Sequence, residues 1–246
     1  MKFVRDLSRR EMLAFLGAAA AGLLDWGCGR PQAAIRAQAA QLSAGAIPSC
    51  VRRPEQIEGP YYIEEALQRS DIRSDPTDGS IRPGVPLRLI FQVSRDDKRG
   101  CTPLPEAVVH VWQCDALGVY SDVRDRNFDT RGKKFLRGHQ LTNERGIVEF
   151  MTIYPGWYPG RTVHIHFKIR TDPNGPKGRE FTSQLYFDDQ LTDEIHRLPP
   201  YNAKGSRTTT NATDLVFRRR GNQLLLPLTR DGQGYRGTFD IALQFA

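Results

Sequence analysis

Residues 161–170 read Arg-Thr-Val-His-Ile-His-Phe-Lys-Ile-Arg, and they hold the most informative pattern in the chain. The apolar run from Thr162 to Ile169 predicts a β-strand. Because side chains alternate between the two faces of a strand, His164 and His166 must share one face. Two imidazoles on one face can bind one metal ion, although a pair on a solvent-facing strand would look the same.

Outward from this strand, short runs rich in Val, Ile, Leu and Phe alternate with turn clusters. Such alternation favours strands over helices, and we predict an all-β fold, an antiparallel β-sandwich with few helices. The only helix expected outside the N-terminal segment is 189–198, with a turn near 64–69. The predicted strands are 86–94, 106–113, 147–153, 162–170, 182–187, 213–217, 223–228 and 238–245.

Two loops deliver aromatic side chains close to the histidine strand. Residues 154–161 read Tyr-Pro-Gly-Trp-Tyr-Pro-Gly-Arg, a double Pro-Gly turn that leads directly into it. Residues 111–120 leave another apolar strand and reach Tyr120 through a glycine turn. Loops held by a rigid scaffold commonly carry function, whereas a single tyrosine taken alone is more often a packing residue.

The motifs resemble those of the intradiol ring-cleaving dioxygenases, a family that includes the catechol 1,2- and protocatechuate 3,4-dioxygenases. The resemblance spans Glu58 to Asp188. It rests on five stretches in the family's order, namely 58–62 (Glu-Gly-Pro-Tyr-Tyr), 112–120, 152–159, 161–167 and 182–187.

The resemblance implies a ferric iron cofactor held by four side chains. The implied ligands are Tyr120, Tyr158, His164 and His166. Phenolate oxygens suit a hard cation such as Fe(III), and a bound metal can remove a phenol proton whose free pKa is about 10. Arg161 falls on the family's active-site arginine, and Gln184 falls on a glutamine that lines the site.

The same resemblance implies the reaction and its participants. A catechol-type diol would be opened by O₂ between its two hydroxylated carbons, giving a muconate-type diacid. Tyr158 matches a ligand that leaves the metal to accept a substrate proton, and Arg161 would stabilise negative charge on the ring. The best-known members of the family carry a tryptophan-containing insert between the positions that match Tyr158 and Arg161, and this insert helps to form the wall of their substrate pocket. This chain lacks the insert. The candidates to form that wall instead are Tyr61, Tyr62, Trp112 and Trp157. Of these, Tyr61 and Trp157 are the predicted substrate contacts.

Two other classes of protein compete with this interpretation. A non-catalytic, exported β-sandwich binding module would need an aromatic surface but not two histidines on one strand face. A zinc or copper hydrolase would recruit a carboxylate or a third histidine near the pair, and the motif contains neither. The remaining histidines, His110, His139 and His196, are predicted to be structural or exposed.

The N-terminus predicts export to the periplasm or the cell exterior. Arg9 and Arg10 precede an apolar run from Met12 to Leu24, the layout of a twin-arginine signal, although an ordinary secretory signal stays open. Ala37-Gln38-Ala39 offers a cleavage site, with residues 44–46 as a second candidate. Cleavage after residue 39 would leave a domain of residues 40–246 and lower the net charge from +7 to +4 by removing six Lys/Arg and three Asp/Glu. That charge does not indicate nucleic acid, and membrane contact is expected only through the signal. Assembly into a homo-oligomer stays open.

Three cysteines would remain after cleavage, in a compartment where disulfides persist. Cys50 and Cys101 lie in turn-rich stretches, whereas Cys114 closes an apolar strand. We therefore predict a bridge between Cys50 and Cys101, with Cys114 as a buried thiol, although spacing alone leaves other pairings open.

Overall fold

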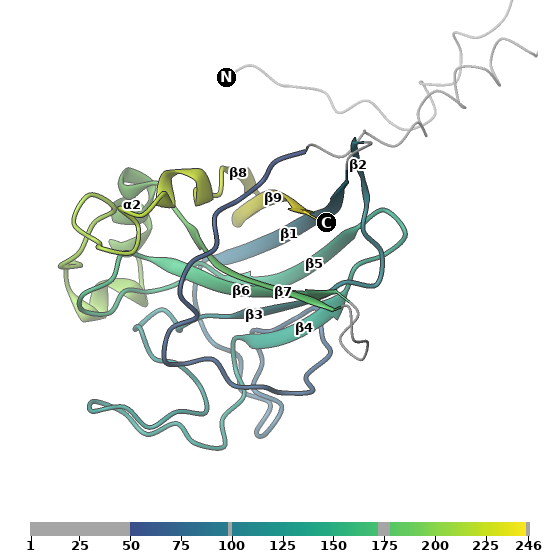
Figure 1. Cartoon of the computed structure of the whole chain (residues 1–246). Helices are drawn as coiled ribbons and strands as arrows, with labels where there is room; N and C mark the ends of the chain where they lie inside the picture. The colour runs from purple at the N-terminus through teal and green to yellow at the C-terminus, as the bar shows by residue number, and fades with distance from the viewer. Residues whose placement is uncertain (1–49, 98–99, 172–177, 245–246) are drawn as a thin grey trace, which may run out of the picture. The chain divides into compact units, whose positions relative to one another are not determined.

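The structure is a computed structural model that describes residues 50–97, 100–171 and 178–244. The predicted signal peptide and its cleavage site lie outside these residues. Within them, strands form two sheets that stack as two layers, the arrangement predicted for a β-sandwich (Figure 1). No helix in the described ranges is long and apolar enough to cross a membrane.

The first sheet is built around its longest strand, β1. Strands β5 and β2 pair antiparallel with successive parts of β1, whereas β9 pairs parallel with it, so this sheet is mixed rather than purely antiparallel. β8 extends the sheet beyond β9. The strands are β1 (Pro86–Asp97), β2 (Gly100–Pro103), β5 (Ile147–Ile153), β8 (Leu228–Asp231) and β9 (Gly234–Gln244).

The second sheet has the order β4-β3-β6-β7 and is antiparallel throughout. Its register places Trp112, His166 and Gln184 in one cross-strand row and pairs His164 with Tyr186. Neighbours in such a row contact one another directly. The strands are β3 (Val108–Trp112), β4 (Arg137–Leu141), β6 (His164–Thr171) and β7 (Arg179–Tyr186).

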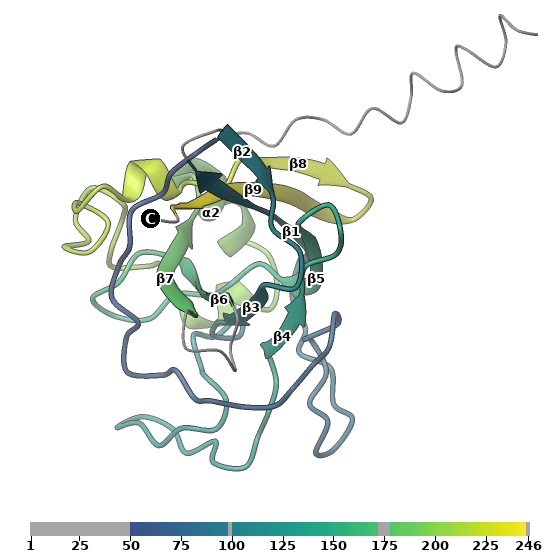
Figure 2. The same ribbon diagram turned by 45° about the vertical axis from the view of Figure 1, so that its right-hand side comes forward.

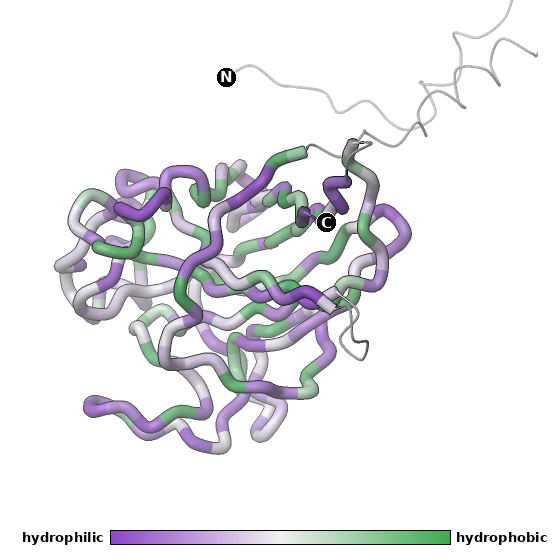
Figure 3. Tube along the Cα trace, viewed as in Figure 1, coloured by the Kyte–Doolittle hydropathy of each residue, from purple (hydrophilic) through white to green (hydrophobic). Residues whose placement is uncertain are grey.

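The core lies between the two layers, where Phe91 packs against Phe150, Phe167 and Phe239. Figure 3 shows hydrophobic positions concentrated along the strands, while the surrounding loops are largely hydrophilic. The layers therefore bury the alternating apolar positions from which the strands were predicted.

Strand β6 is buried on both faces. Ile165, Phe167 and Ile169 face the core, and His164 and His166 are buried on the other face. The N-terminal segment 50–70 crosses that sheet in Figures 1 and 2 and bonds to β7, with Gln56 N donating to the Thr182 carbonyl at 3.0 Å. This cover removes the histidine face from solvent.

The predicted helix is confirmed as α2 (Asp189–His196), which begins where the Asp188 side chain accepts a hydrogen bond from Leu191 N at 2.9 Å. The predicted strands 213–217 and 223–228 are wrong, because Asp214 folds the first into turns. In the second range, η4 (Gly221–Leu224) takes the first two residues, and only Leu228 belongs to a named strand, β8. The turn expected near 64–69 is extended chain instead. A second short 3₁₀ helix, η3, spans Tyr201–Lys204.

The cysteine prediction is confirmed. Cys50 and Cys101 form a disulfide, and Cys114 is a buried free thiol two residues after β3. The bridge ties the described N-terminal residues to β2, at the edge of the first sheet.

Candidate active site

Four side chains predicted to bind a metal meet at one end of β6. His164 and His166 come from the strand, Tyr120 from the loop after β3, and Tyr158 from the loop after β5. The Nε2 atom of His164 lies 3.0 Å from the Tyr158 hydroxyl and 3.0 Å from Nε2 of His166. The Tyr120 ring centre lies 5.8 Å from that of Tyr158. The structure thus brings all four residues together.

The two tyrosine loops are held in contact by their backbones. Asp115 Oδ1 accepts hydrogen bonds from the amides of Leu117 and Val119, which closes a tight turn just before Tyr120. Gly118 sits in that turn at φ +78°, and a Cβ there would lie 2.1 Å from the Trp157 carbonyl oxygen. Only glycine permits this approach, so the turn residues set the spacing of the two tyrosines.

Both imidazoles are neutral in this environment. Burial lowers the pKa of His164 to about 3, assisted by the Arg161 charge, and burial also lowers the pKa of His166 well below its usual value. The His164 Nδ1–H donates to the Thr162 carbonyl at 2.6 Å, which leaves Nε2 as an unprotonated acceptor. A neutral imidazole with a free nitrogen lone pair is the form that binds metals.

The Tyr120 hydroxyl is completely buried, yet it makes no hydrogen bond to any residue that the structure describes. Burial, reinforced by Tyr158, raises the pKa of Tyr120 well above 10. Burial likewise raises the pKa of Tyr158. An unpaired buried hydroxyl is costly, and a cation at this position would compensate it by stabilising the phenolate.

The donor set fits a hard metal ion. Two imidazole nitrogens and two phenol oxygens converge, and one of the oxygens lacks any other partner. In the described part of the chain, the one His, Cys, Asp and Glu group close enough to share an ion is Cys50, Asp96 and Cys101, whose sulfurs form the disulfide. No carboxylate or third histidine therefore joins this pair, unlike a typical hydrolytic zinc site.

Arg161 extends toward the same centre from the loop before β6. One terminal nitrogen, Nη1, lies 3.4 Å from His164 Nε2, and the other, Nη2, donates to Gln184 Oε1 at 2.5 Å. The Nε–H donates to the buried Asp214 at 2.9 Å. Gln184 therefore contacts the arginine, and its amide nitrogen donates to the Ile57 carbonyl at 2.8 Å. Sequence reasoning missed Asp214, because nothing in the linear chain connects it to Arg161.

A cavity of about 390 Å³ opens beside this cluster, within the size range of small-molecule sites. Its lining includes Tyr61, Tyr158 and Lys204 together with the loop 125–128. The Tyr61 ring stacks on Tyr120 at 4.5 Å, and its hydroxyl donates to Asp125 at 2.6 Å. Tyr61 thus lies between this cavity and the predicted metal ligand Tyr120.

The other aromatic candidates lie around the cluster rather than in this cavity. Trp112 stacks on His166, and Tyr62 packs on Trp112 at 4.8 Å. Trp157 is 8% exposed, donates from Nε1 to the Gly205 carbonyl and carries the Lys204 ammonium over its ring. Its role as a substrate contact stays a prediction.

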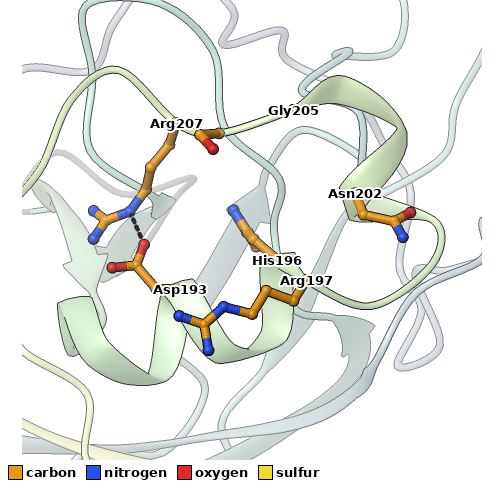
Figure 4. Close-up of a pocket in the computed structure, with 7 residues that line it drawn as sticks. Asp193, His196, Arg197, Asn202, Gly205 and Arg207 are labelled. Atoms are coloured by element: carbon orange, nitrogen blue, oxygen red, sulfur yellow. Dashed lines mark hydrogen bonds and ion pairs between the residues drawn. The ribbon is translucent and has the colours of Figure 1, made fainter.

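A second hollow, of about 510 Å³, lies between α2 and the chain that follows it. Figure 4 shows Arg207 beside Asp193 there, an ion pair of 2.7 Å, with His196 nearby. The His196 Nε2–H donates to the Pro155 carbonyl at 3.1 Å, and His110 faces His139 across β3 and β4. None of these three histidines joins the cluster of predicted metal ligands.

Comparisons with known proteins show which proteins this chain resembles. A family model described as dioxygenase matches residues 57–198. The protocatechuate 3,4-dioxygenase beta chain of Burkholderia cepacia is 29% identical over 194 residues, which cover 75% of this chain and 76% of that protein.

Two solved structures extend the comparison. The intradiol ring-cleavage dioxygenase from Tetranychus urticae is 34% identical with a TM-score of 0.68, and the alignment covers 79% of this chain and 95% of that one. The dioxygenase domain of a dioxygenase carbohydrate-binding protein fusion from Streptomyces sp. SirexAA-E is 32% identical with a TM-score of 0.54, covering 80% and 100%. With the matched family segment spanning more than half of the sequence, this chain belongs to the intradiol dioxygenase family.

Proposed function

We propose that this protein is an exported, ferric-iron-dependent intradiol dioxygenase. It would insert both atoms of O₂ into a catechol-type aromatic ring and cleave it between the two hydroxylated carbons, giving a muconate-type diacid. The observation that carries the proposal is the position of His164 Nε2, 3.0 Å from both the Tyr158 hydroxyl and His166 Nε2, beside the unpartnered Tyr120 hydroxyl.

The iron would be held by Tyr120, Tyr158, His164 and His166. When bound there, Fe(III) would draw both hydroxyl oxygens of a catechol to one centre and supply the electronic coupling between ring and O₂. Two phenolates would offset most of its charge inside a buried site. The protein's own residues then have to admit the diol, accept its protons and stabilise the charge that forms on its ring.

Tyr158 is placed to accept a substrate proton. It is the one residue of the four that lines the cavity, so an incoming diol meets its phenol oxygen first. The same hydroxyl donates to His164 Nε2 at 3.0 Å, a hydrogen bond that ends when that nitrogen binds a metal. As a metal ligand, Tyr158 would already have lost this proton, so its phenolate oxygen could take a proton from the incoming diol.

Arg161 is placed to stabilise negative charge on the diol ring. Its Nη1 group points at His164 Nε2 from 3.4 Å, so it would lie beside a ring that is bound at the same centre. Burial reduces the screening of this charge by water. Because the neighbouring phenols and Asp214 favour its charged form, the pKa of Arg161 is raised despite the opposing effect of burial.

The visible spectrum together with oxygen uptake tests the proposal. Purified protein loaded with Fe(III) should show a tyrosinate-to-iron charge-transfer band, which anaerobic catechols should shift. Under ¹⁸O₂, both labelled atoms should appear in the ring-opened diacid. A colourless protein that binds zinc stoichiometrically would favour a hydrolase. A protein that binds aromatic ligands without any metal would favour the binding module.

Export is supported by the Cys50–Cys101 disulfide, since such bonds persist mainly in oxidising compartments. N-terminal sequencing of protein from the periplasm and the medium of an expressing bacterium tests it. The expected mature chain starts near residue 40. Recovery of an uncleaved chain from the cytoplasm alone, with both cysteines reduced, would contradict export.

A further inference from the structure

We infer that Asp214 is a positioning residue for catalysis, acting through Arg161 by fixing which of its nitrogens faces the substrate. This inference rests on the proposed function for its kinetic test. Asp214 lies 53 residues after Arg161, in a segment that folds into turns, and its side chain is fully buried.

Asp214 bonds to two neighbouring residues at the start of β6. Asp214 Oδ2 accepts a hydrogen bond from Arg161 Nε at 2.9 Å and another from the Thr162 amide at 2.7 Å. A single carboxylate oxygen thus binds both the Arg161 side chain and the Thr162 backbone amide, in the turn that leads into β6. Thr162 is tied a second time, because its hydroxyl donates to Asn211 Oδ1 at 2.8 Å.

Two of the three guanidinium nitrogens of Arg161 already donate to protein acceptors. Asp214 engages Nε, and Gln184 Oε1 accepts from Nη2 at 2.5 Å. Nη1 is then the nitrogen directed at the metal-binding cluster, 3.4 Å from His164 Nε2. A metal on His164 would occupy that nitrogen's lone pair and leave the Nη1 donors facing the bound substrate.

Asp214 is held in its charged form by its surroundings. Burial opposes ionisation, but hydrogen bonds from the Phe217 and Thr162 amides, together with Arg161, hold the pKa of Asp214 below its usual value. Its other oxygen accepts from the Val216 and Phe217 amides at 2.6 and 2.9 Å. The carboxylate is therefore anchored independently of Arg161, as a rigid support requires. A planar guanidinium held at Nε by a fixed anion cannot rotate freely.

Asp75 provides a matched control. It is also fully buried and also organises a turn, accepting hydrogen bonds from the Thr77 amide and hydroxyl at 3.0 and 2.7 Å. It has no contact with Arg161 among the described hydrogen bonds. Asp75→Asn should therefore lower the melting temperature without changing kcat.

The experiment is a double-mutant cycle on the iron-loaded enzyme with Asp214→Asn and Arg161→Gln. Loss of a supporting group of this kind typically costs about 10- to 100-fold in activity. Asp214→Asn should lower kcat to this extent in the wild-type background, with a smaller change in the anaerobic affinity for catechol. In the Arg161→Gln background it should change kcat less than about 2-fold, because the residue through which it acts is gone. An equal loss in both backgrounds would overturn the inference.

A second variant and a structural measurement keep the inference testable if Asp214→Asn does not fold. Asp214→Glu keeps the charge but displaces the carboxylate, and it should lower kcat with iron content retained; an unchanged kcat would overturn the inference. Crystal structures of the iron-loaded variants give a readout independent of turnover, since Nη1 should move away from His164. An unmoved guanidinium would contradict the positioning role of Asp214, even if no catechol is a substrate. A wild-type enzyme that is inactive toward all catechols would instead contradict the proposed function.

Discussion

The indole ring of Trp112 lies flat on the imidazole of His166, with ring centres 5.0 Å apart and an interplanar angle of 8°. His166 Nδ1 makes no hydrogen bond to the described residues, so no acceptor fixes this ring in the way that the Thr162 carbonyl fixes His164. Together with the 3.0 Å contact between its Nε2 and His164 Nε2, stacking on Trp112 therefore helps to set the orientation of the His166 ring. Aromatic contact is worth about 0.5–1.5 kcal/mol beyond the area that it buries.

Trp112→Leu should consequently weaken iron binding while the fold is retained. We expect the iron affinity to fall by about 10-fold, the lower end of the range for residues that orient metal ligands. Trp112→Phe, which keeps an aromatic face, should lose less. Iron titration, followed by the visible band, measures the iron affinity of both variants. Equal iron affinities for Trp112→Leu, Trp112→Phe and the wild type would show that stacking on Trp112 does not support iron binding.

Replacing any of Tyr120, His164 or His166 with alanine should abolish iron and colour together. Each is buried and supplies a donor atom that no neighbour can replace. His139→Ala is the matched control, because His139 lies on β4, which β3 separates from the histidine strand β6, and this variant should keep both properties. Stoichiometric ferric iron with an intact band in the His164 and His166 variants would disprove this ligand set.

Gly59→Ala tests how closely the N-terminal segment is fitted to the metal-binding residues. Gly59 has φ +77°, and an added Cβ would lie 3.1 Å from His166 Cε1. Gly79 has a similar φ of +74° with nothing within 4 Å of an added Cβ. Both variants should lose roughly 1–2 kcal/mol of stability from the left-handed backbone.

Only Gly59→Ala should also lower the iron affinity, since His166 is the group that has to move. Chemical denaturation measures the backbone strain that both variants share. Iron titration measures the effect of the contact with His166, which only Gly59→Ala introduces. Similar iron binding by the two variants would show that the segment covers His166 without constraining it.

The disulfide should stabilise the fold without affecting the site. The Cys50–Cys101 bridge closes a loop with a sequence separation of 51 residues, for which restriction of the unfolded chain predicts about 4 kcal/mol. Cys50→Ser with Cys101→Ser should therefore unfold at a lower denaturant concentration and keep its colour and kcat. Loss of iron in this double variant would show that the bridge supports the metal-binding residues as well.

Sequence reasoning succeeded where the physical cause is local. Alternating apolar residues predicted β1, β3, β5, β6, β7 and β9, and a strand's period of two placed His164 beside His166. It missed the short, polar strands β2, β4 and β8, which carry little apolar pattern. The resemblance to the dioxygenases supplied both tyrosines, which come from separate loops and have no periodic relation to the histidines.

The failure at residues 213–217 has a specific cause. Leu215, Val216 and Phe217 look like a buried strand, but the Asp214 side chain accepts hydrogen bonds from the backbone amides of Val216 and Phe217. This local competition for the backbone favours turns. The same aspartate then pairs with Arg161, a long-range contact that only the folded chain reveals.

Arg161→Gln should separate catalysis from metal binding, because the guanidinium lies beside the metal-binding cluster and is not itself a ligand. Iron content, colour and anaerobic catechol binding should be kept. Turnover should fall by about 10²- to 10³-fold, the usual effect of losing one preorganised charge-stabilising group. Arg161→Lys should recover little, since an ammonium keeps the charge but cannot bond to Asp214 and Gln184 while also directing a donor at His164. Oxygen uptake with a panel of catechols, measured beside iron content, provides the check. Near-normal ring opening by Arg161→Gln with every accepted catechol would refute a catalytic role for this charge.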